Sequence, residues 1–350
     1  MVNVEEFRSL AEELYLVTVQ REYGTKGVTL LKRLLVALQN IYRYLDPENV
    51  LGSIVVMQSI DDDDVPPILK AAPAPIEVLK PESIGEDASG PLLVQILANG
   101  QLRIWPKYTA DCIELSKAAI VYEYKGKVER IFANGQPRTV PRVSAVHASM
   151  FAIPCFSSLR EAFEHYRVHM VKVSSCKILS NAWFDGNRIF LKAGPEEDMR
   201  DSLHQFLVSS LRGVEVRPEQ NTGITNPVDI KVKWLFTNRI ALIEIKWLGK
   251  SKDLSGAIKV KYTDNRARSG ATQLAEYLDN NYQHAPDHVT RGYLVVFDAR
   301  RWRTQAASTS IDRSNGLYYQ HRDIEYDPKY HEIREDFERP VRFFMEPRIS

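Results

Sequence analysis

The chain has 350 residues, a net charge of +1 at neutral pH and three cysteines, Cys112, Cys155 and Cys176. This length favours two domains, and the near-zero charge gives no global sign of nucleic-acid binding. The odd number and wide spacing of the cysteines exclude a disulfide framework and fit a reducing compartment. We find no apolar run of about 18 residues and no signal peptide, so we expect a cytoplasmic protein without membrane contact.

The first 60 residues have the pattern of helices. Apolar side chains recur at helical spacing over residues 4–20 and 27–45, and Gly24 and Gly27 interrupt the pattern. We therefore predict a helical hairpin or small bundle over residues 1–60. Core packing is the ordinary explanation of its apolar faces, and a surface for a homodimer or a partner protein is the functional one.

Residues 61–91 differ sharply in composition from the rest. They contain six of the eighteen prolines, and eight acidic residues against two lysines. This composition is typical of a linker or an extended arm. An acidic arm that covers a basic groove is a further hypothesis. For the four aspartates of residues 61–64, a solvated run is a simpler explanation than metal binding.

Residues 92–185 are predicted to be rich in β-strand. Short apolar runs alternate with the turn signals Asn99-Gly100, Lys125-Gly126 and Asn134-Gly135. A helix over 157–171 and short strands over 172–191 follow. We interpret this accessory region as a sensor, a specificity module or an oligomerisation layer.

Two strands of a β-hairpin are predicted next. Residues 228–236 and 240–247 are rich in β-branched and aromatic side chains, and the polar residues 237–239 separate them. Alternate residues of a strand share a face, so Glu244 and Lys246 point the same way. Ordinary alternating charge on a half-exposed hairpin would give the same pattern.

The length of the turn decides whether Asp229 joins this pair. A two-residue turn at 237–238, or a four-residue turn at 236–239, places Asp229 opposite Lys246. Directly opposed side chains have Cβ atoms about 5 Å apart, so Asp229, Glu244 and Lys246 would form one cluster. A three-residue turn would reverse the parity and separate them. Such a cluster suits chemistry in which two carboxylates hold Mg²⁺ and a lysine lies beside a metal-bound water that attacks a phosphodiester.

A helix over residues 270–282 is predicted after the hairpin, with Thr272 as its N-cap. Gln273 and Tyr277 lie one turn apart on one side of it. A buried strand over 291–298 follows, so the order favours a right-handed crossover on a mixed sheet. Gln273 could hydrogen-bond a carboxylate, a water or a phosphate, and Tyr277 could do the same or stack on a base. An exposed glutamine and a core tyrosine are the ordinary alternatives.

Together, Asp229, the Glu244-Ile245-Lys246 run and the Gln-x-x-x-Tyr pair on the helix resemble the PD-(D/E)xK, or restriction-endonuclease-like, nuclease superfamily. The helix is similar to the version in the RecB-like branch. The resemblance covers roughly residues 190–300 and implies a mixed sheet flanked by helices. Here Val228 separates Pro227 from Asp229, so the literal Pro-Asp pair of the family is absent.

The resemblance also implies roles for these residues. Asp229 and Glu244 would bind Mg²⁺ or Mn²⁺, and Lys246 would position or deprotonate the attacking water. Gln273 and Tyr277 would be auxiliary residues of the same catalytic site.

The family often carries one more acidic residue on a helix before the hairpin. Pro195 opens a predicted helix that runs to about Leu211, and three acidic residues follow it. Glu196 falls on the apolar face of this helix, whereas Glu197 does not. We expect Glu196 to be an outer metal ligand, with Glu197 as the alternative. Complementing the helix dipole is the ordinary role of such acids.

Positive charge gathers near the proposed site. Residues 231–268 carry ten Lys and Arg against three acids, a local balance of +7. Such residues bind phosphates without regard to sequence. A second cluster, residues 300–303, adds three arginines around Trp302, which could stack on a base. A solvated positive face is the ordinary alternative. The predicted nucleic-acid-binding residues are Lys250, Lys252, Lys259, Lys261, Arg266 and Arg268.

The chain as a whole is therefore predicted to be a mixed α/β (α+β) protein. We expect a metal-dependent nuclease, an endonuclease acting on DNA or else RNA, in a setting such as restriction or anti-phage defence. The alternative is a catalytically inactive subunit that kept the nuclease fold for nucleic-acid binding or assembly. The expected regions are a helical bundle over 1–60, a linker over 61–91, a β-rich region over 92–185, the nuclease domain over 186–305 and an extension over 306–350.

Overall fold

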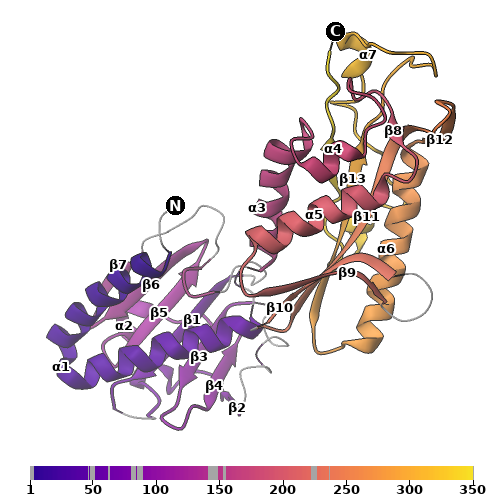
Figure 1. The fold of residues 1–350 in the computed structure, drawn as a ribbon. Coiled ribbons are helices and arrows are strands. Elements are labelled where there is room, and N and C mark those ends of the chain that lie inside the picture. Colours follow the sequence, from indigo (N-terminus) through magenta and orange to yellow (C-terminus); the bar gives the residue numbers. More distant parts are fainter. Residues whose placement is uncertain are drawn as a thin grey trace. The chain divides into compact units, whose positions relative to one another are not determined.

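The structure of the protein is a computed structural model, drawn as a ribbon in Figure 1. It describes residues 4–45, 47, 52–61, 64–79, 84, 90–140, 149–152, 155–221, 227–235 and 237–349, and of residues 4–14, 220 and 221 it describes the backbone only. The chain forms two compact units, Met1–Pro154 and Cys155–Ser350. Each unit has its own sheet and its own hydrophobic core.

A long helical element, α1 (Val4–Tyr44), packs on one face of the first sheet and bends at Gly24. There φ is 63° and ψ is −155°, a conformation that glycine adopts without steric cost. Two helical arms therefore meet at Gly24, as Figure 1 shows. The second arm buries Leu31, Leu34 and Leu38. The predicted break between two N-terminal helices is confirmed.

The first sheet has seven strands in the order β2-β4-β3-β1-β5-β6-β7. β1 and β3 run parallel, and the other neighbouring pairs run antiparallel. Helix α1 covers one face, while the short helices η1 and α2 cover the other. The elements are β1 (Ser53–Ser59), η1 (Pro67–Leu69), β2 (Ile76–Val78), β3 (Leu92–Ile96), β4 (Leu102–Pro106), α2 (Cys112–Leu115), β5 (Ala119–Lys125), β6 (Val128–Ala133) and β7 (Gln136–Thr139).

The segment 61–91, expected to be a linker or an extended arm, contributes to this sheet instead. Strand β2 pairs with β4 and buries Val78. The side chain of Gln95 donates a hydrogen bond to the backbone carbonyl of Asp64 at 2.9 Å. The described part of the segment therefore contributes one short strand and a few buried side chains to the first unit, although most of its residues are exposed. Residues 62–63 lie outside the described residues.

The boundary between the units falls at residue 154, earlier than the expected boundary at 185. Helix α3 (Phe156–Tyr166), which confirms the helix predicted over 157–171, continues as one π-helical turn, η3 (Arg167–Val171). The short strands expected over 172–191 are wrong, because most of that segment is α4 (Lys177–Asn181) and loop. Leu179 and Trp183 of this segment belong to the hydrophobic core of the second unit.

The second unit contains a mixed sheet in the order β14-β13-β11-β10-β9. β9, β10 and β11 are antiparallel neighbours, whereas β13 runs parallel to both β11 and β14. The long strand β11 extends past this sheet and there pairs with β12 and β8. The elements are β8 (Leu191–Lys192), α5 (Glu196–Ser210), β9 (Val214–Asn221), β10 (Pro227–Trp234), β11 (Arg239–Lys252), β12 (Ile258–Tyr262), α6 (Asp264–His284), β13 (Val289–Asp298), α7 (Arg313–Gly316), α8 (Tyr330–Ile333) and β14 (Val341–Phe344).

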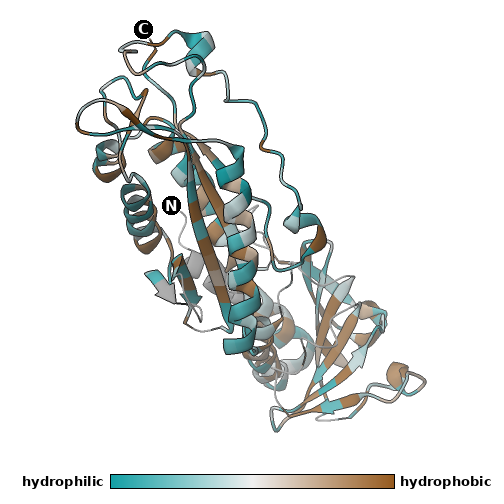
Figure 2. Cartoon of the chain, turned by 90° about the vertical axis from the view of Figure 1, so that its right-hand side faces the viewer, coloured by the Kyte–Doolittle hydropathy of each residue, from teal (hydrophilic) through white to brown (hydrophobic). Residues whose placement is uncertain are grey.

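Helices cover both faces of this sheet. On one face, Ile243 and Ile245 pack with α3 and α5. On the other face, Leu294 and Val296 pack with α6 (Figure 1). Figure 2 shows the division of hydropathy, with hydrophobic residues along the strands and hydrophilic residues on the outer surface of α6. Glu244 and Lys246 interrupt the apolar pattern on the α6 face.

The stretch between the hairpin and the helix is more ordered than the sequence suggested. Residues 248–269, which lie between the predicted hairpin and the predicted helix, form the end of β11, strand β12 and the first turns of α6. Thr272 lies inside α6, so its predicted role as N-cap is wrong, and Thr263 precedes the helix. The parallel strand pair that the predicted crossover requires is present, because β11 and β13 run parallel, with β12 and α6 between them in the chain.

Residues 306–350, expected to be an extension, complete the second unit. Strand β14 pairs with β13 at the edge of the sheet. Asp298, fully buried at the end of β13, accepts hydrogen bonds from Arg300 at 2.9 and 2.7 Å and from Arg342 at 2.8 Å. The guanidinium of Arg342 also donates to the carbonyl of Arg322 at 2.7 Å. These contacts hold the C-terminal residues on the sheet.

The architecture as a whole is mixed α/β, with two mixed sheets flanked by helices, as predicted. Within the described residues, none of the helices combines the length and the apolar composition that a membrane crossing requires.

Candidate functional site

The hairpin brings Asp229 and Glu244 together, although in a different register from the predicted one. Ile230 pairs with Ile243, so continuing the ladder places Asp229 opposite Glu244 instead of Lys246. The shift is two residues along β11, which preserves the parity that the prediction required. β10 ends at Trp234, so the turn is centred one residue earlier than expected.

A backbone hydrogen bond fixes the carboxylate of Asp229 against β11. The N–H of Ile245 donates to Oδ2 of Asp229 at 2.7 Å. The half-buried position raises the pKa of Asp229, and the Ile245 N–H and the charge of Lys246 oppose that rise only in part. Burial therefore makes the ionised form of Asp229 less stable than it is in water.

Glu244 and Lys246 form a buried pair on the α6 face of β11. Only 1% of Glu244 and 3% of Lys246 is exposed, and Nζ of Lys246 donates to Oε1 of Glu244. The other oxygen, Oε2 of Glu244, is buried and accepts no hydrogen bond from the described residues, and the carboxyl group of Asp229 is close enough to share a proton with Glu244. Burial, followed by the neighbouring charge of Asp229, raises the pKa of Glu244 to about 8. A buried carboxylate with one unpaired oxygen is costly unless a further ligand completes it.

Glu196 reaches the same cluster from the first turn of α5. Its Oε1 lies 3.6 Å from Nζ of Lys246, and its Oε2 accepts a hydrogen bond from Nη2 of Arg266 at 3.2 Å. Glu197 is exposed and, among the described residues, makes no hydrogen bond or ion pair with this cluster. Of the two acids considered in the sequence, Glu196 is therefore the one that faces the site.

Gly270 of α6 makes room for the lysine. A Cβ added at this position would lie 2.5 Å from Cγ and 3.2 Å from Cε of Lys246. The stem of Lys246 therefore runs directly along the helix backbone, which limits the positions that its amine can take. Sequence reasoning did not identify Gly270, because a lone glycine in a helix has several ordinary explanations.

Gln273 and Tyr277 lie at the other edge of the cluster. Nε2 of Gln273 donates to the hydroxyl of Tyr277, and that hydroxyl donates to the carbonyl of Pro227 at 3.3 Å. Burial, followed by the charge of Glu244, raises the pKa of Tyr277 to about 12. These contacts tie α6 to the start of β10, two residues before Asp229. Tyr277 is too buried to stack on a base as the sequence allowed.

The six predicted nucleic-acid-binding residues fall into two groups. Lys259 and Lys261 are exposed on β12, and Arg268 is half-exposed on α6. Lys252 is buried, with its amine 4.0 Å from the centre of the Phe190 ring, so its predicted role is wrong. Lys250 donates to Thr304, and Arg266 binds Glu196.

The second basic cluster that the sequence suggested is largely structural. Arg300 and Arg301 are buried. Arg300 donates a hydrogen bond to Asp298, and Arg301 donates one to the carbonyl of Met345. Trp302 stacks on Tyr318, with ring centres 4.4 Å apart. Arg300 and Arg301 therefore hold the C-terminal residues in place, whereas Trp302 and Arg303 are exposed.

The donor set fits a divalent cation that keeps part of its hydration. Among the described residues, there is no group of three or more His, Cys, Asp or Glu side chains that could hold a metal ion. The cluster instead offers two neighbouring carboxylates, Asp229 and Glu244, with Glu196 beyond Lys246. Mg²⁺ is commonly held by one or two carboxylates together with waters and substrate phosphates. The unpaired Oε2 of Glu244 is the atom that such an ion would satisfy.

Comparisons with known proteins add no relative. No family model matches the chain, and neither a curated protein nor a solved structure matches it. Its function must therefore be argued from its own residues.

Proposed function

We propose that the second unit hydrolyses phosphodiester bonds of DNA or RNA with the help of Mg²⁺ or Mn²⁺. One observation carries the proposal: Asp229, Glu244 and Lys246 converge in a single buried cluster, and one oxygen of Glu244 accepts no hydrogen bond from the described residues. Two carboxylates and an amine in contact match the chemistry that the resemblance implies.

Asp229 and Glu244 would hold the cation, and Glu196 would act through water as an outer ligand. When bound, the ion would lower the pKa of a coordinated water and offset charge on the phosphate. The protein contributes a fixed geometry, because the N–H of Ile245 orients Asp229. The contact with Lys246 orients Glu244 in the same way.

Lys246 would position or deprotonate the attacking water. Its amine lies between Glu244 and Glu196, and Gly270 restricts its stem. From this position, Nζ would donate a hydrogen bond to the nucleophile or to a phosphate oxygen. Because the amine is already ordered, little reorganisation would be needed during the reaction.

Arg266 and the exposed lysines of β12 would contact the phosphates. Nε of Arg266 is buried and has no acceptor among the described residues, although Nη2 binds Glu196. A phosphate oxygen would provide this acceptor, and guanidinium groups suit phosphate geometry. Lys259 and Lys261 would add affinity that does not depend on sequence and that falls with salt.

A cleavage assay tests this proposal. Plasmid DNA, single-stranded DNA and RNA are incubated with the full chain in Mg²⁺, in Mn²⁺ or in EDTA. We expect cleavage of at least one substrate with metal and none in EDTA. Asp229→Asn should abolish cleavage, whereas Glu197→Gln, an exposed change one residue from Glu196, should preserve it.

The alternative, a catalytically inactive nucleic-acid-binding subunit, predicts a different result. The protein would bind these substrates in a mobility-shift assay and leave them intact in both metals. Cleavage by Asp229→Asn at the wild-type rate would contradict the assignment of the site.

A further inference from the structure

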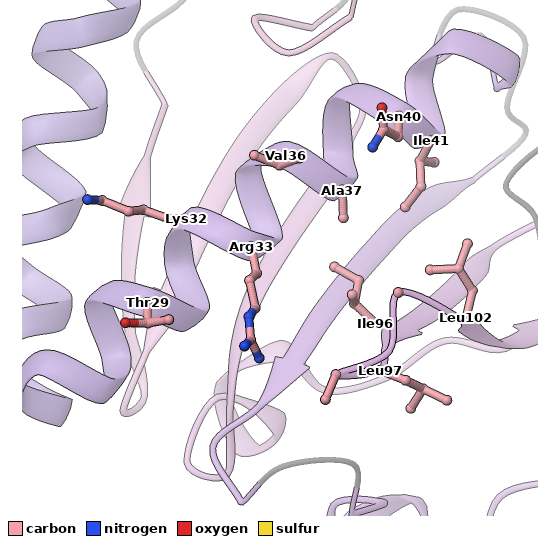
Figure 3. Close-up of a pocket in the computed structure, with 12 residues that line it drawn as sticks. Thr29, Lys32, Arg33, Val36, Ala37, Asn40, Ile41, Ile96, Leu97 and Leu102 are labelled. Carbon is pink, nitrogen blue, oxygen red and sulfur yellow. The ribbon is translucent and has the colours of Figure 1, made fainter.

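A cavity of about 460 Å³ lies in the first unit, between the second arm of α1 and the β3–β4 hairpin (Figure 3). Its volume falls in the range of small-molecule sites. The helix contributes side chains spaced three and four residues apart, among them Val36, Ala37 and Ile41. The hairpin contributes Ile96 and Leu97. The cavity is thus built by two rigid elements and not by loops alone.

The walls of the cavity are mainly apolar. Val36 is 59% exposed and offers an apolar surface at the cavity wall. In Figure 3, Ala37 and Ile41 point from the helix toward Ile96 and Leu97. An apolar body of a ligand would cover these side chains and remove them from water.

The mouth of the cavity is positively charged. Lys32 and Arg33 line it, and none of the lining residues is acidic. Figure 3 shows Arg33 extending from the helix toward the hairpin, whereas Lys32 points away on the other side. In the part of the chain that the structure describes, neither Lys32 nor Arg33 forms an ion pair. The positive field at the mouth is therefore not neutralised locally.

We propose that this cavity binds a small organic anion with an apolar body, such as an aliphatic or aromatic carboxylate. The apolar body would lie against Ile41 and Ile96, and the anionic group would meet Arg33. Charge complementarity supports this occupant, since a cationic or neutral molecule of the same shape would gain nothing from Arg33. The inference does not depend on the nuclease proposal, because the site lies entirely in the first unit.

Binding is tested on the full chain by isothermal titration with two probes of equal chain length, decanoate and decyltrimethylammonium. We expect saturable one-to-one binding of decanoate and at least about tenfold weaker binding of the cation. Arg33→Glu should weaken decanoate by about tenfold or more and leave the cation no weaker. Lys125→Glu is the matched control, because Lys125 is exposed at the end of β5, away from the cavity lining.

A second variant keeps the test independent of Arg33. Val36→Asp places a carboxylate at an exposed position of the wall, so it should fold normally and still weaken decanoate. Circular dichroism confirms folding of each variant. Equal affinity for both probes, or unchanged decanoate binding in Arg33→Glu, would overturn the proposal. Sedimentation analysis could instead show a dimer that dissociates in Val36→Asp, together with no decanoate binding in wild type. That result would mean that a second copy of the chain covers this face, and it would also overturn the proposal.

Discussion

Glu129 in the first unit and Glu244 in the second are both buried glutamates, and their surroundings differ in one decisive respect. Oε1 of Glu129 accepts hydrogen bonds from the hydroxyls of Tyr122 and Ser149, each at 2.6 Å, and Oε2 accepts from the N–H of Met150 at 2.7 Å. Glu244 accepts a hydrogen bond from Lys246 at one oxygen and none from the described residues at the other, where its neighbour is a second carboxyl group, that of Asp229. A buried carboxylate that the fold satisfies is structural, whereas one that it leaves incomplete is a candidate for ligand binding.

The largest effect is expected when the charge of Glu244 is removed, and this change tests the difference between the two glutamates most directly. Glu244→Gln keeps the shape of the side chain and removes its charge. We expect cleavage to fall by roughly 100- to 1,000-fold, because charge stabilisation at the reacting phosphate is lost. Single-turnover rates at saturating Mg²⁺ measure this loss. Glu129→Gln is the matched control, and a similar fall in its rate would remove the distinction between the two glutamates.

Removing the complete carboxylate should instead lower stability. Glu129→Leu leaves the donors of Tyr122, Ser149 and Met150 without their acceptor in a buried region. We expect the free energy of unfolding to fall by about 3 kcal/mol. Urea denaturation monitored by circular dichroism checks this value. An unchanged midpoint would show that the network around Glu129 contributes little.

The raised pKa of Glu244 predicts how stability depends on pH when metal is absent. The folded state holds its proton up to about pH 8, whereas the unfolded state loses it near the ordinary value of 4.5. The folded state therefore binds more protons across this window, and stability in EDTA should fall as pH rises through it, by a few kcal/mol in order of magnitude. Denaturation of wild type and Glu244→Gln at several pH values measures the effect. The comparison isolates Glu244, since Glu129 also has a raised pKa in both proteins. Equal slopes in the two proteins would contradict the assignment.

A substitution at Gly270 should have a smaller effect on cleavage and tests whether this residue positions Lys246. In Gly270→Ala the new methyl group would collide with the stem of Lys246 and displace its amine. We expect cleavage to fall by about tenfold while the fold survives, a loss typical of disturbed positioning residues. Ser269→Ala, an exposed change on the same helix, is the control. A rate equal to wild type would show that Lys246 does not need this position.

The core of the site could be predicted from the sequence because strand parity is a local property. Asp229, Glu244 and Lys246 meet whenever the hairpin loop has an even number of residues, so the cluster survived an error in register. The error itself arose at the turn. Strand β10 ends at Trp234, which is buried against Phe156 with ring centres 5.3 Å apart, although its β-forming composition extends two residues further.

The errors elsewhere have one cause, which is that composition does not reveal long-range partners. Prolines and acids made residues 61–91 resemble a linker, yet β2 pairs with a strand more than twenty residues away. A count of basic residues could not show that Lys252 lies on Phe190 or that Asp298 binds Arg300. Gly270 and the N–H of Ile245 act through close approach and backbone geometry, which no motif records.

The arginines on Asp298 bear on how the second unit could be produced in isolation. A recombinant fragment that stopped before Val341 would lose Arg342, and Asp298 would keep only Arg300 as a counter-ion in its buried position. The same cut would strip β13 of its neighbour and expose a hydrophobic strand edge, a known route to aggregation. Truncated versions for crystallisation or activity assays should therefore extend at least through Met345, even though the acidic cluster lies a hundred residues earlier.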